Sequence, residues 1–301
     1  MRNLSLALDW SVNSNHIVFL LAVEKGFYAE VDIDLTVQSP FDDNYARTPA
    51  KKVELGISDL ALCPIESVLS YRVKRSPFEL VAIASLFQKD LSAIACTRSS
   101  NVQSAKDLDG KVYASFNARY EDSILRSMIR QNGGKGDLEI CYPEKLGIWN
   151  TILNNKAHAT WVFLNWEALM AEAEGVDLVY LDLASAGVPY SYSPIIAANK
   201  ISVVERAGLF EDFLKASRKG FLYAKSHPEE AKEILKDLMP ASERSIDLHK
   251  SIVMTLNAMG DKDTWGKIDL QKFKQFMDWL YHNKIETADI PINDLVVNSL
   301  I

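Results

Sequence analysis

The stretch that decides the fold is residues 3–28, which read NLSLALDWSVNSNHIVFLLAVEKGFY. Leucine stands at every second position of residues 3–8, which is the period of a half-buried strand. A polar turn with three possible helix caps at 13–15 leads into an apolar helix, and Gly26 is placed to end it. The stretch therefore predicts a strand, a turn and a helix, the opening of an α/β fold.

The turn inside this stretch gathers polar and aromatic side chains at a strand end and a helix start. Ligands of open α/β sheets bind there, because backbone N–H groups point outward. We expect Trp10 to stack on a planar or apolar part of a ligand. Asn13, Asn15 and His16 either hydrogen-bond that ligand or only cap the helix.

Composition limits the classes of partner. The chain has 301 residues, 48% of them hydrophobic and 24% charged, with a net charge of −7. This balance argues against nucleic acid as a partner, since phosphate binding needs clustered positive charge. No apolar run is long enough to span a membrane. The N-terminus lacks a signal-peptide pattern, so we expect a cytoplasmic protein, or a periplasmic one if a signal peptide was removed.

Three cysteines, Cys63, Cys96 and Cys141, form no CxxC pair. Such a sparse, odd set is typical of buried thiols in a reducing compartment. No histidine stands at ligand spacing from them, so we predict no metal site.

Strand and helix patterns alternate as far as residue 199, which predicts mostly parallel sheets covered by helices. The remaining third shows helical spacing at residues 209–225, 228–238, 245–259 and 270–282. Trp265 and Trp279 in this third are expected to pack. Trp161 is expected to lie in the core. Two back-to-back strand pairs, near 80–97 and 178–198, are placed to carry the chain to a second lobe and back.

Several motifs carry a resemblance to a known family. They are Leu8-Asp9-Trp10 with His16, Glu24 to Tyr28, Asp107 to Lys111, Phe213 to Ala216, Gly220-Phe221, and His227 to Ala231. With them the chain resembles the two-lobed periplasmic substrate-binding proteins of type II. More narrowly, it resembles the branch that contains binding proteins for thiamine pyrimidine precursors and the pyrimidine-precursor synthase of thiamine biosynthesis.

The resemblance implies an α/β fold with parallel or mixed sheets flanked by helices and a ligand cleft between two lobes. Lobe 1 would comprise residues 1–89 and 195–301, and lobe 2 residues 90–194. It also implies that the lobes close on a small polar or anionic ligand. An enzyme of hydroxymethylpyrimidine biosynthesis is the alternative function.

Departures from the synthase weaken that alternative. Cys63 stands where the synthase has the lysine that binds pyridoxal phosphate, and Ser67 stands where it has its substrate histidine. A Schiff base needs an amine, which neither side chain has. Residues 188–192 lack the cysteine-rich run of the synthase. Residues 114–119 lack the glycines of its phosphate turn.

Further candidates follow other strands. Pro64, Glu66 and Ser67 open a helix, where Glu66 can accept from a ligand amine or complement the helix dipole. Four candidates for an anion position in lobe 2 follow the strand predicted at residues 112–115 and precede a helix: Ser115, Phe116, Asn117 and Arg119. Arg119 can grip an anion as a planar fork or pair with a neighbouring carboxylate.

The last candidates lie late in the second lobe: Phe163, Asn165, Tyr190 and Tyr192. No catalytic set, metal site or cofactor site is predicted, and the catalytic residues stay unknown. The partner predicted is a small-molecule ligand with a planar or apolar part and an anionic or polar part. A transport partner cannot be named from the sequence.

Overall fold

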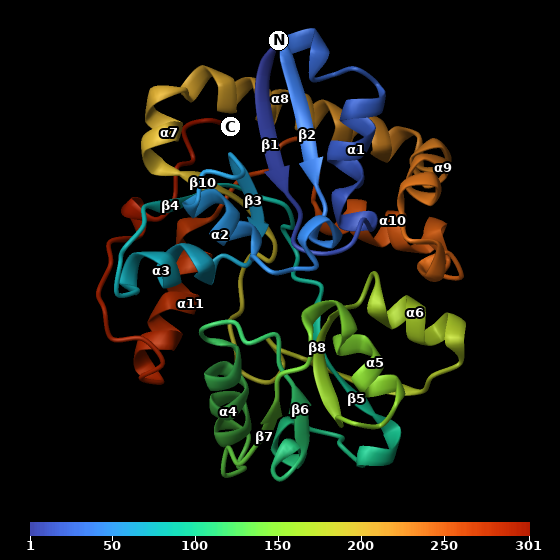
Figure 1. Ribbon diagram of the computed structural model, residues 1–301. Coiled ribbons are helices and arrows are strands. Elements are labelled where there is room, and N and C mark those ends of the chain that lie inside the picture. The colour runs from blue at the N-terminus through green and yellow to red at the C-terminus, as the bar shows by residue number, and fades with distance from the viewer. The chain divides into compact units, whose positions relative to one another are not determined.

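The computed structural model describes residues 1–301, which form two compact units. Unit 1 contains Met1–Asp90, Tyr192–Asp269 and Asp289–Ile301, and unit 2 contains Leu91–Ser191 and Leu270–Ala288. Each unit is built on a five-stranded mixed sheet accompanied by helices (Figure 1). The predicted α/β class with mixed sheets is confirmed. No helix is long and apolar enough to cross a membrane.

The sheet of unit 1 has the strand order β2-β1-β3-β10-β4. Its strands are β1 (Arg2–Ala7), β2 (Ile33–Gln38), β3 (Leu60–Cys63), β4 (Leu80–Ser85) and β10 (Ile195–Asn199). β1 pairs in parallel with both β2 and β3, whereas β10 runs antiparallel to β3 and β4. The leucines of β1 are buried at Leu4 and Leu6, as their alternation predicts.

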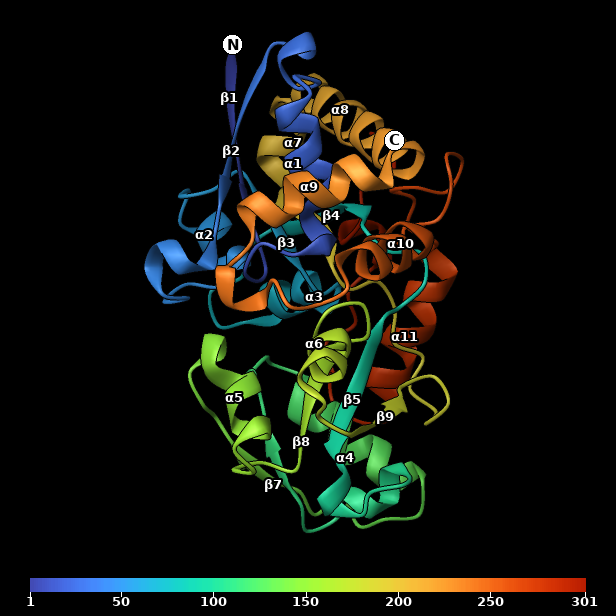
Figure 2. The same ribbon diagram turned by 90° about the vertical axis from the view of Figure 1, so that its right-hand side faces the viewer.

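Two helices of unit 1 lie side by side, α1 (Ile17–Glu24) and α8 (Ala207–Ser226) (Figure 2). The rings of Phe19 and Phe213 stack across them at 6.1 Å between centroids. A Cβ placed on Gly220 of α8 would lie 2.2 Å from the carbonyl oxygen of Val18. The two helix backbones approach this closely because Gly220 has no side chain.

The other helices of unit 1 surround this pair and the sheet. They are α2 (Pro49–Glu54), α3 (Glu66–Val73), α7 (Lys200–Glu205), α9 (Pro228–Leu238) and α10 (Leu248–Ala258). α7 has no counterpart in the sequence prediction. It is only six residues long, and the Asn199 side chain caps it by accepting from the N–H groups of Ile201 and Ser202.

The sheet of unit 2 repeats the same topology, in the order β7-β6-β8-β5-β9. Its strands are β5 (Ser92–Thr97), β6 (Val112–Ala114), β7 (Glu139–Cys141), β8 (Ala159–Phe163) and β9 (Leu178–Asp182). β6 pairs in parallel with β7 and β8, whereas β5 is antiparallel to β8 and β9. β5 is the first strand after the chain enters unit 2, and β10 is the first strand after the chain returns to unit 1.

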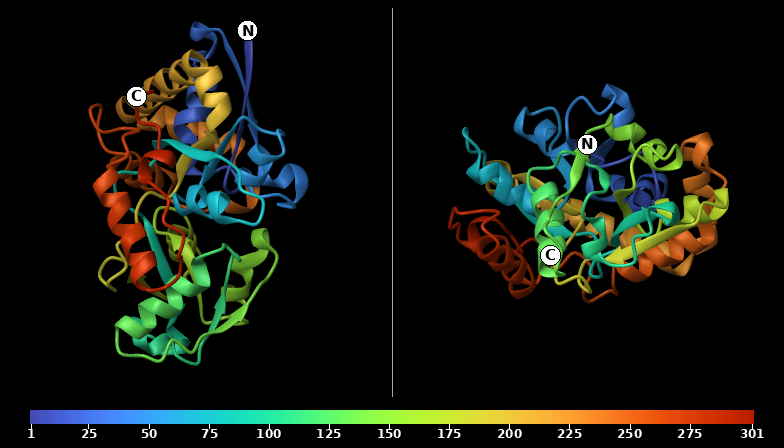
Figure 3. Two further views of the ribbon diagram at one scale, coloured as in Figure 1. Left: turned by 90° about the vertical axis from the view of Figure 1, so that its left-hand side faces the viewer. Right: turned by 90° about the horizontal axis from the view of Figure 1, so that it is seen from below.

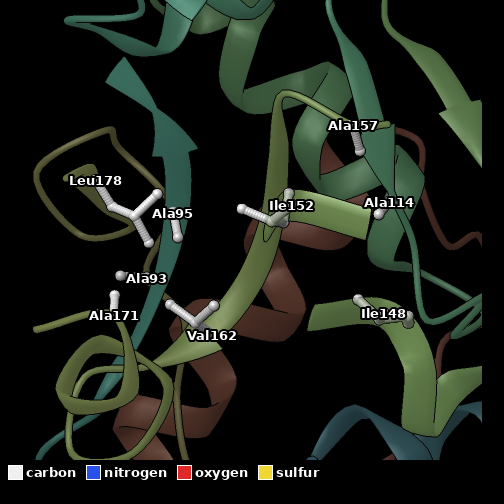
Figure 4. Close-up of a cluster of buried hydrophobic side chains, with 9 residues drawn as sticks. All are labelled: Ala93, Ala95, Ala114, Ile148, Ile152, Ala157, Val162, Ala171 and Leu178. Atoms are coloured by element: carbon white, nitrogen blue, oxygen red, sulfur yellow. The ribbon is translucent and has the colours of Figure 1, made fainter. Parts of the chain in front are cut away.

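Small aliphatic side chains fill part of the core of unit 2 (Figure 4). Ala93 and Ala95 of β5 and Val162 of β8 meet Ile152 of α5 (Ile148–Leu153) in this cluster. The sheet is also accompanied by α4 (Glu121–Gln131) and α6 (Glu167–Glu174).

The last long helix, α11 (Leu270–His282), belongs to unit 2, although the sequence placed residues 195–301 wholly in the first lobe. Aromatic packing accounts for the difference, because the rings of Phe276 and Tyr190 form a T-shaped pair with their centroids 5.1 Å apart. The end of α11 also reaches α4, where the Gln131 amide donates to Asn283 (Figure 3). Helical periodicity predicts the helix but not the sheet on which it packs.

Candidate functional site

The carboxyl ends of three adjacent strands of unit 1, β2, β1 and β3, lie at one edge of the sheet. Strand order changes direction between β1 and β3, and such a point is where open α/β sheets bind ligands. Trp10 follows β1, Tyr45 follows β2, and Glu66 follows β3. This edge is the unit 1 site.

The imidazole of His16 is fully engaged within the turn after β1. Its Nδ1 accepts from the backbone N–H of Asn13 at 3.1 Å, so the neutral ring carries its proton on Nε2. Nε2 then donates to the Asp9 carboxylate at 2.8 Å. Asn13 also accepts from the N–H of Asn15, so Asn13 and His16 form a capping box at the start of the helical segment.

Two aromatic rings flank the end of β1. The Trp10 ring is half-buried, and its centroid lies 6.1 Å from that of Tyr45 at an interplanar angle of 57°. Asn44 and Tyr45 both adopt left-handed backbone conformations, with φ of 51° and 52°, which is uncommon for residues with side chains. Burial, and then the nearby carboxylate of Asp9, raise the pKa of Tyr45, so its phenol stays protonated.

The thiol of Cys63 lies at the end of β3. Burial raises the pKa of this thiol to about 12, although a hydrogen bond with Ser67 opposes the shift. Glu66, the first residue of α3, is buried and adds to the rise in pKa by its charge. At neutral pH Cys63 is therefore a thiol rather than a thiolate nucleophile.

Carboxylates outnumber cations around this edge. Asp9 and Glu66 are joined by Asp43, which pairs with the buried ammonium of Lys52 at 3.3 Å. Glu243 accepts from the hydroxyl of Ser11, next to Trp10, at 3.3 Å. The side chains at the unit 1 site thus favour a ligand that donates hydrogen bonds.

In the turn after β6 in unit 2, which was predicted as an anion position, the protein's own side chains engage the N–H donors. The N–H groups of Phe116 and Ala118 donate to the Glu121 carboxylate at 3.1 and 3.3 Å. The hydroxyl of Ser115 is also engaged, because it donates to Asp122 at 2.6 Å and accepts from the N–H of Asn117.

Arg119 pairs within unit 2, with a carboxylate that the sequence did not indicate. Its guanidinium lies 3.3 Å from the buried Glu286 carboxylate and 5.4 Å from the Tyr120 ring centroid. The Tyr120 hydroxyl donates to the same carboxylate at 2.7 Å. Arg119 therefore ties the turn before α4 to the segment that follows α11, while 43% of its side chain stays exposed.

The remaining candidates are spread over both units. In unit 2, Phe163 donates its N–H to Glu167 at 2.8 Å and Asn165 is buried, while Tyr190 packs against Trp161 at 5.0 Å. In unit 1, the buried Tyr192 uses its hydroxyl to accept from the N–H of Asp269. Pro64 is half-buried beside Cys63.

Four polar residues described at the unit 1 site, Asp9, Asp43, Tyr45 and Glu243, were missed as candidates. Asp9 precedes Trp10 directly, so its place after a strand was a usable signal. Asp43 and Tyr45 lie in a segment with no motif that indicates a site, and Glu243 is distant in sequence. Only the tertiary structure brings Tyr45 and Glu243 close to the residues after β1.

Comparison of folds defines the class. The structure is similar to that of the alkanesulfonate-binding protein SsuA from Xanthomonas axonopodis pv. citri, with a TM-score of 0.72 over 99% of this chain and 98% of that one. Identity is only 11%, so the likeness concerns the fold alone. The protein has the periplasmic-binding-protein fold, as the sequence predicted.

Residues 13–231 match the family model described as NMT1/THI5 like, which covers most of the chain. The chain belongs to this NMT1/THI5-like family. The predicted resemblance to the thiamine pyrimidine branch is thereby confirmed.

Two curated relatives are similar over most of their length. A formylaminopyrimidine-binding protein from Halalkalibacterium halodurans is 24% identical over 93% of this chain and 85% of its own. A 4-amino-5-hydroxymethyl-2-methylpyrimidine phosphate synthase from Legionella pneumophila is 23% identical over 78% of this chain and 73% of its own.

Proposed function

We propose that this protein binds a small planar nitrogen heterocycle, of the aminopyrimidine class, at the unit 1 site. The observation that carries the proposal is the pairing of two aromatic rings, Trp10 and Tyr45, with an excess of carboxylates after β1, β2 and β3. The name of the formylaminopyrimidine-binding relative supports the same class of ligand.

Stacking and hydrogen bonding suit such a ligand in different ways. A flat heterocycle that stacks on an aromatic ring such as that of Trp10 is stabilised by buried area and by ring–ring attraction. Its amino group and any ring N–H are donors, and the Asp9 and Glu66 carboxylates are acceptors only. A carboxylate that accepts from such a donor forms a charge-assisted bond, which is stronger than a neutral one.

Binding without chemistry is the function that these side chains support. Cys63 is protonated and buried, Ser67 is bonded to it, and both nitrogens of His16 are engaged within the turn. Neither Cys63 nor Ser67 supplies the amine that a Schiff base requires. The planar part of the predicted ligand is retained in this proposal, and its second part is polar rather than anionic.

Calorimetry with formylaminopyrimidine tests the proposal. Trp10→Ala should weaken binding by about 1–3 kcal/mol through lost stacking and buried area, and Trp10→Phe should restore part of it. Glu66→Gln should cost about 1.5–3 kcal/mol if its carboxylate accepts from the ligand. Trp161→Phe, a change of a tryptophan in unit 2, is the control and should bind as tightly as the unchanged protein.

The melting temperature of each variant without ligand shows whether the replaced side chain belongs to the binding site or to the core. Trp10→Ala should leave it nearly unchanged, since the ring is only half-buried. Full-strength binding by both Trp10→Ala and Glu66→Gln would rule out this site.

A further inference from the structure

The segment between β2 and α2 brings Tyr45 to the unit 1 site on a tightly folded turn, residues 40–45. The N–H of Tyr45 donates to the carbonyl of Pro40 at 2.7 Å and closes this turn. Asn44 and Tyr45 are left-handed in succession, with φ of 51° and 52°. This backbone conformation is unfavourable for an aromatic residue, and it persists only where the surrounding structure holds it. Contacts outside the turn must therefore fix its shape.

A buried ion pair fastens the turn to α2. Only 6% of the Lys52 side chain is exposed, and its ammonium lies 3.3 Å from Oδ1 of Asp43. That oxygen is buried and accepts no hydrogen bond, so the ammonium is what compensates its charge. The other oxygen, Oδ2, lies 3.7 Å from the guanidinium of Arg47, which is half exposed. Because a buried charge without a partner is costly, the pair opposes any movement that draws Asp43 away from α2.

The ion pair and the aromatic ring belong to the same short turn. Asp43 and Tyr45 are two residues apart in the chain. Burial is the main cause of the raised pKa of Tyr45, and the Asp43 carboxylate is among the charges that add to it. The Tyr45 ring centroid in turn lies 6.1 Å from that of Trp10. A displacement of Asp43 would therefore also displace the ring that lies beside Trp10.

We infer that Lys52 is a positioning residue of the unit 1 site, whose ion pair with Asp43 holds residues 40–45 in the strained form that keeps the Tyr45 ring beside Trp10. For its effect on a ligand the inference rests on the proposed function, in which Tyr45 is one of the two rings assigned to the heterocycle. Without the pair, the turn relaxes from its left-handed conformation and the ring is in place for only part of the time. Affinity then falls in proportion to that part.

Hydrogen exchange of the full-length chain, followed by mass spectrometry without any ligand, tests whether Lys52 holds the turn. In Lys52→Met, peptides covering residues 40–48 should take up deuterium about tenfold faster than in the unchanged protein, because local opening exposes their backbone N–H groups. The other peptides of unit 1 should exchange as before, whereas a role in overall stability alone would accelerate exchange throughout the unit. Lys51→Met is the matched control on α2, since Lys51 pairs with Glu54 at 2.7 Å and is largely exposed. It should leave uptake by residues 40–48 unchanged.

Calorimetry with formylaminopyrimidine tests whether Lys52 acts through Tyr45. Lys52→Met should weaken binding about tenfold when Tyr45 is present, and by less than about twofold in the Tyr45→Ala background, where the ring to be positioned is absent. Lys51→Met should bind as the unchanged protein does. If the unchanged protein does not bind formylaminopyrimidine, the proposed function fails, and the exchange experiment still decides whether Lys52 holds the turn.

A second variant keeps the test decisive if Lys52→Met does not fold. Asp43→Asn breaks the same pair from the side of the turn and should give the same local increase in uptake. Unchanged uptake by residues 40–48 in these variants, or an equal increase over all of unit 1, would overturn the inference. So would a loss of affinity in Lys52→Met that is the same with and without the Tyr45 ring.

Discussion

Replacing Gly220 by alanine should destabilise unit 1, because the added Cβ has no space between α1 and α8. That atom would lie 2.2 Å from the Val18 oxygen and 2.9 Å from the Ala22 Cβ. The first distance is about 1.3 Å short of the roughly 3.5 Å at which such atoms pack without strain. The obstacle is helix backbone, so no rotamer change relieves it and the helices must separate.

The cost follows from two opposing effects. Overpacking of a well-packed core costs about 1–3 kcal/mol, and a backbone clash belongs at the upper end of that range. Alanine is better than glycine inside a helix by about 1 kcal/mol. The net loss in the free energy of unfolding should therefore be about 2 kcal/mol.

Gly208 supplies the control in the same helix, since a Cβ there meets no atom within 4 Å. Gly208→Ala should be neutral or stabilising by up to about 1 kcal/mol. Urea unfolding followed by far-ultraviolet circular dichroism compares the two variants in the transition of unit 1. Gly220→Ala that proves as stable as Gly208→Ala would refute the reasoning, because it would mean that the helices separate at no cost.

Two further predictions concern the carboxyl group of Glu286 and Schiff-base formation with pyridoxal phosphate. Burial alone would raise the pKa of Glu286, but the N–H of Ala288 and the Tyr120 hydroxyl, with further donors, lower it overall. Its contribution to stability is present above the pKa of the unfolded chain and is lost as the pH falls through the folded value. Glu286→Gln should therefore melt at a lower temperature than the unchanged protein at pH 7. Between pH 7 and pH 3 its melting temperature should fall by less than that of the unchanged protein. Parallel plots of melting temperature against pH for the two proteins would contradict this. Pyridoxal phosphate should form no Schiff base near Cys63 and Ser67, and a pyridoxyl-lysine peptide from this region after borohydride reduction would disprove it.

Most secondary structure could be read from local patterns. The alternating leucines predict β1, and helical spacing predicts α8, α9, α10 and α11 within a few residues. The short helix α7 was missed because its six residues carry little periodic signal, and the Asn199 cap defines it instead. The assignment of α11 to unit 2 also could not be predicted, since the partners of Phe276 and Asn283 are remote in sequence.

By itself the sequence determined the fold class, the family and the position of the turn from Asp9 to His16, because strand and helix periods, caps and motifs are local properties of the chain. The tertiary structure decided which side chains meet. It brought Tyr45 to Trp10 and Glu243 to Ser11, and it turned Glu121 back onto the N–H groups after β6. Whether a charged side chain is free to bind a ligand depends on its neighbours in space. Arg119 looks available in the sequence but is paired with Glu286 in the folded chain.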